Sequence, residues 1–175
     1  MGNRRRLMTG RRSAWRFAWA VAVLSMPSAA AAANLCPWLN EATASGLLGA
    51  NAVGAYSEAA GGQPAVCTFT AAQERGERTL KIEVETAANA HERLEDVLKS
   101  CGSGASLVKA IGNEAQRCEG SGGKGSTSEF LAGRVRDQVF SITLGTTLRK
   151  DPVLSEEMMR AEIVTAAEQV SGNLF

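Results

Sequence analysis

Residues 80–85 alternate strictly between apolar and charged side chains, and this alternation is the strongest constraint on the fold. A period of two is typical of a strand that has one face in a core and the other in solvent. Residues 65–71 and 138–145 show the same period. The pattern predicts buried side chains at Leu80, Ile82, Val84, Phe140, Ile142 and Leu144, and exposed side chains at Lys81 and Glu83.

Short polar segments join these strands. Residues 73–77 are polar and contain Gly76, so they predict a hairpin turn between residues 65–71 and 78–86. Asp137 marks a second turn. Further strands are expected at residues 114–119, 130–136 and 138–145, with a short one near Val53.

Three segments have the period of an amphipathic helix instead. They cover residues 37–50, residues 89–101, and a final stretch that begins near Asp151 or Ser155 and ends at Gly172. Asn40 is a predicted helix cap, and Asn89 with Glu92 resembles a capping box.

The resulting order of elements is α-β-β-α-β-β-β-α. Hairpins dominate this order, and no β-α-β rhythm of a parallel sheet runs through it. The sequence therefore predicts an α+β fold: a single domain with an antiparallel sheet and helices packed on one face.

The N-terminal residues 1–33 have the pattern of a cleavable signal peptide. Six arginines and no acidic residue precede the apolar run FAWAVAVLSM, and small residues lead to a predicted cut after Ala33. The run has about ten residues, too few to span a bilayer as a helix. We therefore expect residues 34–175 to form a periplasmic or extracellular domain without a stable membrane span. Asn3–Met8 also fits a twin-arginine signal, so the Sec and twin-arginine routes both stay open.

Removing the signal peptide changes the charge balance. The chain has 19 Lys and Arg against 18 Asp and Glu, and residues 1–33 take six arginines away. The remaining residues carry a net charge of −5. An acidic domain is a poor candidate for binding nucleic acid, which requires a basic surface.

All four cysteines, Cys36, Cys67, Cys101 and Cys118, follow the predicted cut. An even count in an exported chain indicates two disulfides. Closure of local loops favours Cys36–Cys67 with Cys101–Cys118, while Cys36–Cys118 with Cys67–Cys101 remains an alternative. The spacing lacks the close cysteine pairs typical of structural zinc sites.

No catalytic, cofactor or metal site is predicted. Gly120–Gly125 is glycine-rich but fails the spacing of a phosphate-binding loop. His91 is the single histidine and lies in the first turn of a predicted helix. The carboxylates Glu83, Glu85, Glu92 and Glu95 are expected on solvent faces. Trp38 is expected to cover the first disulfide. The chain is therefore predicted not to be an enzyme and to need no cofactor.

Several segments together resemble a known family. They are CPWLNEATASGLLG from Cys36 to Gly49, a strand that contains Cys67, Ile111–Ala115 (IGNEA) and Gly133–Asp137 (GRVRD). The chain resembles a family of small bacterial lipoproteins and secreted domains of unknown function. The resemblance implies a Cys36–Cys67 bond and a one-domain α+β fold, and it supplies no catalytic residue.

The chain departs from many members of that family in two respects. Leu35 precedes Cys36 where a lipobox requires a small residue, and Cys101 and Cys118 are additional. The leading expectation is a non-enzymatic exported envelope module that binds a protein or a small ligand. The alternative is an inhibitor or protective factor that acts on an exported enzyme.

Overall fold

The computed structural model describes residues 35–120 and 125–175. The predicted signal peptide and most of the glycine-rich segment 120–125 lie outside the described residues. None of the helices in the described part is long and apolar enough to cross a membrane.

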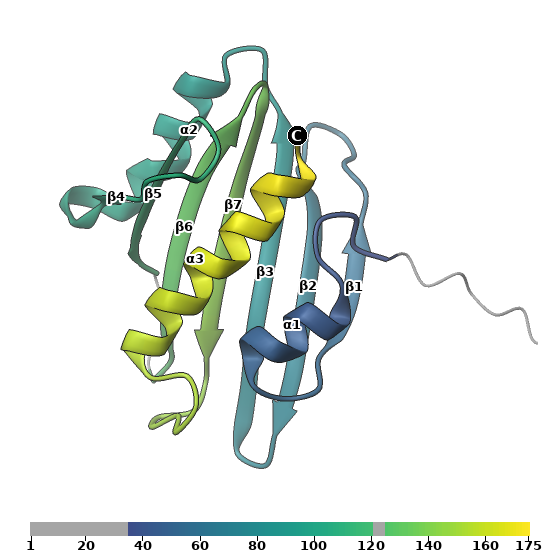
Figure 1. The fold of residues 1–175 in the computed structure, drawn as a ribbon, viewed down its shortest axis with the longest axis vertical. Coiled ribbons are helices and arrows are strands. Elements are labelled where there is room, and N and C mark those ends of the chain that lie inside the picture. Colours follow the sequence, from purple (N-terminus) through teal and green to yellow (C-terminus); the bar gives the residue numbers. More distant parts are fainter. Residues whose placement is uncertain (1–34, 121–124) are drawn as a thin grey trace, which may run out of the picture. The chain divides into compact units, whose positions relative to one another are not determined.

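The described residues form one antiparallel sheet of seven strands with three α-helices, which confirms the predicted α+β class (Figure 1). The strand order is β1-β2-β3-β7-β6-β5-β4. The strands are β1 (Val53–Ser57), β2 (Ala65–Gln73), β3 (Gly76–Thr86), β4 (Ser106–Leu107), β5 (Glu114–Glu119), β6 (Thr127–Val135) and β7 (Gln138–Thr146). The helices are α1 (Glu41–Leu48), α2 (Ala90–Leu98), a 3-10 segment η1 (Lys99–Gly104) and α3 (Glu156–Asn173).

The two predicted hairpins form the middle of the sheet. Gln73 pairs with Gly76 in the β2–β3 turn, and Val135 pairs with Gln138 in the β6–β7 turn. Strands β3 and β7 join the hairpins, with Ile82 opposite Ile142. All six side chains predicted to be buried in β3 and β7 are buried, and Lys81 and Glu83 on the opposite face are partly exposed.

Helices α1 and α3 cover the same face of the sheet, as Figure 1 shows. They pack on β2, β3, β6 and β7, and together these elements enclose the main core. The apolar stripe of α3 is buried at Met159, Ile163, Ala166, Ala167 and Val170.

Helix α2 differs from the expectation that the helices share one face. Its buried residues Ala90 and Leu94 pack on Ala132 and Val139. Successive side chains of a strand point to opposite faces, and the residues beside these two, Leu131 and Phe140, belong to the main core. Strands β6 and β7 therefore bury apolar side chains on both faces, and α2 covers those on the second face.

The helix ends agree with the sequence at α1 and differ at α2. Asn40 Oδ1 accepts a hydrogen bond from the Thr43 N–H at 2.8 Å, and Gly49 ends α1 with a left-handed φ of 62°. Asn89 makes no side-chain cap; its amide donates to Glu92 Oε2 at 3.2 Å instead. The predicted capping box is therefore wrong.

The two disulfides pair as the local loops favoured. Cys36 is bonded to Cys67 and Cys101 to Cys118, with Cα–Cα distances of 5.7 and 5.6 Å. Cys67 lies opposite Ile82 and faces α1 and α3, whereas Cys118 lies opposite Phe130 and faces α2. The first disulfide therefore fastens the segment before α1 to the face that carries α1 and α3. The second fastens η1 to the face that carries α2.

Candidate functional site

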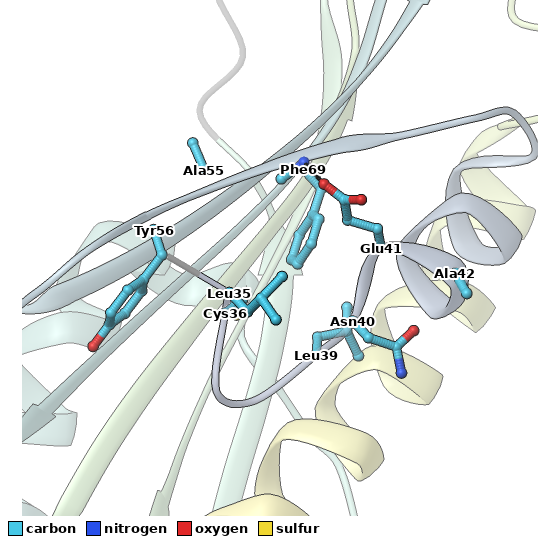
Figure 2. A pocket seen from close by; sticks show the side chains of 10 residues that line it. Leu35, Cys36, Leu39, Asn40, Glu41, Ala42, Ala55, Tyr56 and Phe69 are labelled. Atoms are coloured by element: carbon cyan, nitrogen blue, oxygen red, sulfur yellow. Dashed lines mark hydrogen bonds between the residues drawn. The ribbon is translucent and has the colours of Figure 1, made fainter. Parts of the chain in front are cut away.

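A cavity of about 690 Å³ opens beside β1, on the face that carries α1. Its walls come from the segment before α1, the first turn of α1, and strands β1 and β2. The residues that define it are Leu35, Leu39, Glu41, Gly54, Tyr56 and Phe69 (Figure 2).

The wall before α1 is fixed at both ends. The Cys36–Cys67 disulfide bonds its start to β2. Trp38 packs edge-to-face on Tyr56, with ring centroids 6.0 Å apart, and its carbonyl accepts a hydrogen bond from Asn173 Nδ2 at 3.0 Å. These contacts hold the wall against β1 and α3, so the cavity is built into the fold. Trp38 is buried, and its ring contact is with Tyr56, the residue that pairs with Cys67.

Gly54 keeps the floor of the cavity open. The ring of Phe69, which is 1% exposed, lies against Gly54, its partner in β1. A Cβ atom at Gly54 would come within 2.9 Å of Phe69 Cε1, so a side chain there would collide with the ring. Leu39 is buried at the wall, while Leu35 at the rim is 73% exposed.

Glu41 is the charged residue of the lining. Its Oε1 accepts a hydrogen bond from the Gly54 N–H at 2.8 Å. Asn40, whose side-chain amide also lines the cavity, is engaged as the cap of α1. The cavity therefore presents apolar surface with a single carboxylate at the edge of the sheet.

His91 belongs to an ion-pair cluster on the surface. Its Nδ1 lies 2.8 Å from Glu114 Oε1, which also accepts from Arg134 Nε at 2.6 Å. The hydrogen bond to Glu114 and its charge raise the pKa of His91. Burial acts to raise the pKa of Glu114, but hydrogen bonds from His91 and Arg134 lower it overall. The cluster joins α2 to β5 and β6.

The described residues contain no group of three or more His, Cys, Asp or Glu side chains placed to hold a metal ion. The other carboxylates considered from the sequence are partly or fully exposed, at Glu83, Glu85, Glu92 and Glu95. Glu85 pairs with Arg93 of α2 at 2.7 Å. The glycine-rich residues 120–125, which do not have the spacing of a phosphate-binding loop, lie mostly outside the described part of the chain.

A buried ion pair that the sequence analysis missed lies under the end of α1. Asp151 accepts five hydrogen bonds, from Arg78 Nε and Nη2, the Thr146 hydroxyl, and the N–H groups of Val153 and Leu154. Burial acts to raise the pKa of Asp151, but these donors, led by Arg78, outweigh it and hold the pKa well below its usual value.

Arg78 also donates to the Leu48 carbonyl at 2.9 Å, so this pair joins β3, the end of α1 and the approach to α3. Glu129 is the second buried carboxylate; it pairs with Arg117 and Arg160 beneath α3. Both carboxylates are saturated by partners within the fold. Their arrangement is that of structural ion pairs.

No family model matches the chain, and no curated protein or solved structure shows a match to it.

Proposed function

We propose that this chain is an exported, non-enzymatic envelope module that binds a protein or small ligand through the cavity beside β1. The observation that carries the proposal is the cavity itself. A volume of about 690 Å³ lies within the range of ligand pockets. Its lining is mostly apolar and preformed, with one carboxylate at the edge, as is typical of binding sites.

Export is supported by two independent features. The N-terminal residues have the charge and apolar pattern of a signal peptide. Both disulfides form in the described residues, and stable disulfides are characteristic of oxidising compartments such as the periplasm. Membership in the family of secreted domains that the chain resembles remains part of this proposal.

A neutral apolar fluorophore such as N-phenyl-1-naphthylamine tests the cavity. We expect saturable binding to one site, with chemical-shift changes at Leu39, Tyr56 and Phe69. The substitution Leu35→Glu places a second carboxylate at the rim of the cavity. It should weaken binding of the fluorophore about tenfold or more, equivalent to roughly 1.4 kcal/mol.

Leu107→Glu is the matched control. Leu107 is a leucine of similar exposure, 78% against 73% for Leu35, but lies in β4 at the other edge of the sheet. This variant should bind the fluorophore like the unmodified protein. Equal effects of the two substitutions, or no saturable binding, would contradict the proposed site.

A further inference from the structure

We propose that the partner is a protein segment in extended conformation, which adds to β1 as a new edge strand, places a large apolar side chain in the cavity, and carries basic residues. This inference rests on the proposed binding function and names the class of partner. Recognition by strand addition combines main-chain hydrogen bonds with pockets for alternate side chains.

Strand β1 lies at one edge of the sheet in the described part of the chain. Among the described strands it pairs only with β2. The β2–β3 turn has two residues, so Gln73 and Gly76 form a hydrogen-bonded pair. Successive residues of a strand direct their N–H and C=O groups to opposite sides. The groups of Thr68 and Thr70 therefore point toward β1, where these residues pair with Ala55 and Val53.

The backbone groups of Gly54 and Tyr56 consequently point away from β2. The hydrogen bond from the Gly54 N–H to Glu41 supports this direction independently, because that N–H would otherwise face β2. Gly54 and Tyr56 therefore direct their backbone N–H and C=O groups toward the position of a further antiparallel strand, with the Gly54 N–H held by Glu41 in the structure.

Strand β1 contains none of the residues that protect many edge strands, and its only cover in the described residues is the Glu41 carboxylate on the Gly54 N–H. Natural edge strands carry lysine, proline or a bulge, or are very short. The sequence of β1 is VGAYS, with five residues in regular register with β2. The opposite edge strand, β4, has only two residues. The longer of the two edge strands is therefore the one beside the cavity.

The position of Gly54 connects this edge to the cavity. The side chain of an added residue opposite Gly54 would point to the same face as Tyr56 and Phe69, since paired residues share a face. Gly54 has no side chain to meet it. An apolar side chain at that position would thus extend over Gly54 toward Phe69 and Leu39.

The charge around the edge selects a basic segment. Residues 35–63 contain no Lys, Arg or His, but Glu41 lies at the edge and Glu58 follows β1 directly. A basic side chain can pair with Glu41 and release the Gly54 N–H for the added strand. A second copy of this chain fits poorly, because pairing of β1 with β1 would bring two Glu41 carboxylates into one interface.

The first test selects a displayed library of random twelve-residue segments on the purified, oxidised protein. We expect enriched segments with a large apolar residue and Lys or Arg two positions away, on the same face of the strand. On Glu41→Gln the preference for basic residues should disappear while the apolar preference stays. Enrichment without this pattern, or no enrichment, would overturn the inference.

The second test separates strand addition from simple insertion of a side chain. Two N-methylated forms of the most enriched peptide are prepared, with the methyl groups on alternate residues and the two forms displaced by one residue. One form blocks the N–H groups that face β1, so it should bind at least about tenfold more weakly, whereas the other should change binding by less than about twofold.

Equal binding by the two methylated forms would overturn strand addition. If the fluorophore still occupies the cavity in that case, the proposed function stands and only the class of partner is wrong. If neither fluorophore nor peptide is affected by Leu35→Glu, both proposals fail.

Discussion

Asp151 shows how a single residue can organise several elements without any mark in the sequence. It follows a lysine and precedes a proline, a context that suggests a surface turn. In the fold its carboxylate is saturated by Arg78 and by backbone donors, 73 residues from Arg78 along the chain. Only the folded chain brings the two side chains together.

Replacing Asp151 tests this ion pair. Asp151→Asn keeps the size of the side chain but leaves the buried Arg78 charge uncompensated, so we expect a loss of about 3–5 kcal/mol in the free energy of unfolding. Glu83→Gln, which removes a partly exposed pair with Lys81, should cost less than about 1 kcal/mol. Chemical denaturation measures both, and equal losses would contradict a special role for Asp151.

The pH dependence of the same variant has a defined sign. The pKa of Asp151 is lowered in the fold, so its contribution is complete above the unfolded value of about 3.9 and is lost as pH falls below it. The stability difference between the protein and Asp151→Asn should therefore be constant near neutral pH and shrink below about pH 4.

His91 titrates with the opposite sign. Glu114 raises its pKa, so the contact stabilises the fold below the unfolded value of about 6.5 and is lost as pH rises through the raised pKa. In an NMR titration Glu114→Gln should lower the pKa of His91. Glu92→Gln, on the same helix without a contact to His91 in the structure, should leave it nearly unchanged; equal shifts would show that general surface charge is responsible.

Among the elements, the strands were predicted better than the packing of the helices. The two central hairpins follow from alternation and turn residues, which are local properties. Strand β4 escaped prediction because its two residues give no period. The face on which α2 packs was not predicted. Ala132 and Val139 point to that face, and this is evident only once Leu131 and Phe140 of the same strands are known to lie in the main core on the other face.

The asparagines that precede α1 and α2 differ in their hydrogen bonds and form a matched pair for mutation. Asn40 caps α1 and Asn89 caps nothing. Asn40→Ala should therefore lower the free energy of unfolding by about 1 kcal/mol, whereas Asn89→Ala should cost only a few tenths. Thermal unfolding of both variants decides this, and a larger loss at Asn89 would show that the cap assignment is reversed.

The Cys101–Cys118 disulfide fastens η1 to β5 on the face of α2. Replacing both cysteines with serine should cost about 2–5 kcal/mol, because the unfolded chain gains freedom when the loop opens. Hydrogen exchange should increase first in α2 and η1, while α1 and α3 on the other face stay protected. An unchanged melting temperature would show that this bond does not stabilise the fold.

In the described part of the molecule, the two faces of the sheet carry different features. One face buries the main core under α1 and α3, and its edge carries the cavity. The other face carries α2 and a smaller apolar cluster. The first disulfide holds the wall of the cavity, so breaking it should affect ligand binding more than breaking the second.

The predicted cleavage after Ala33 can be tested on the exported protein. If residues 1–33 are a signal peptide, the mass of the exported protein should correspond to a chain that begins at or near Asn34. That mass should also be lower by the hydrogen atoms lost when the two disulfides form. Peptide mapping without reduction should show Cys36 joined to Cys67. A product that keeps the apolar run FAWAVAVLSM would contradict cleavage.

Features that depend on neighbours along the chain could be predicted from the sequence: the alternating strands, the hairpin turns and the cap at Asn40. Loop closure favoured one pairing of the cysteines, and the fold selected it over the alternative. The tertiary structure alone decided what depends on residues far apart: the Arg78–Asp151 pair, the second face covered by α2, and the cavity. The cavity needs Leu39 before α1, Gly54 in β1 and Phe69 in β2 to meet. No local period encodes such a meeting, because it depends on the register and packing of three separate segments.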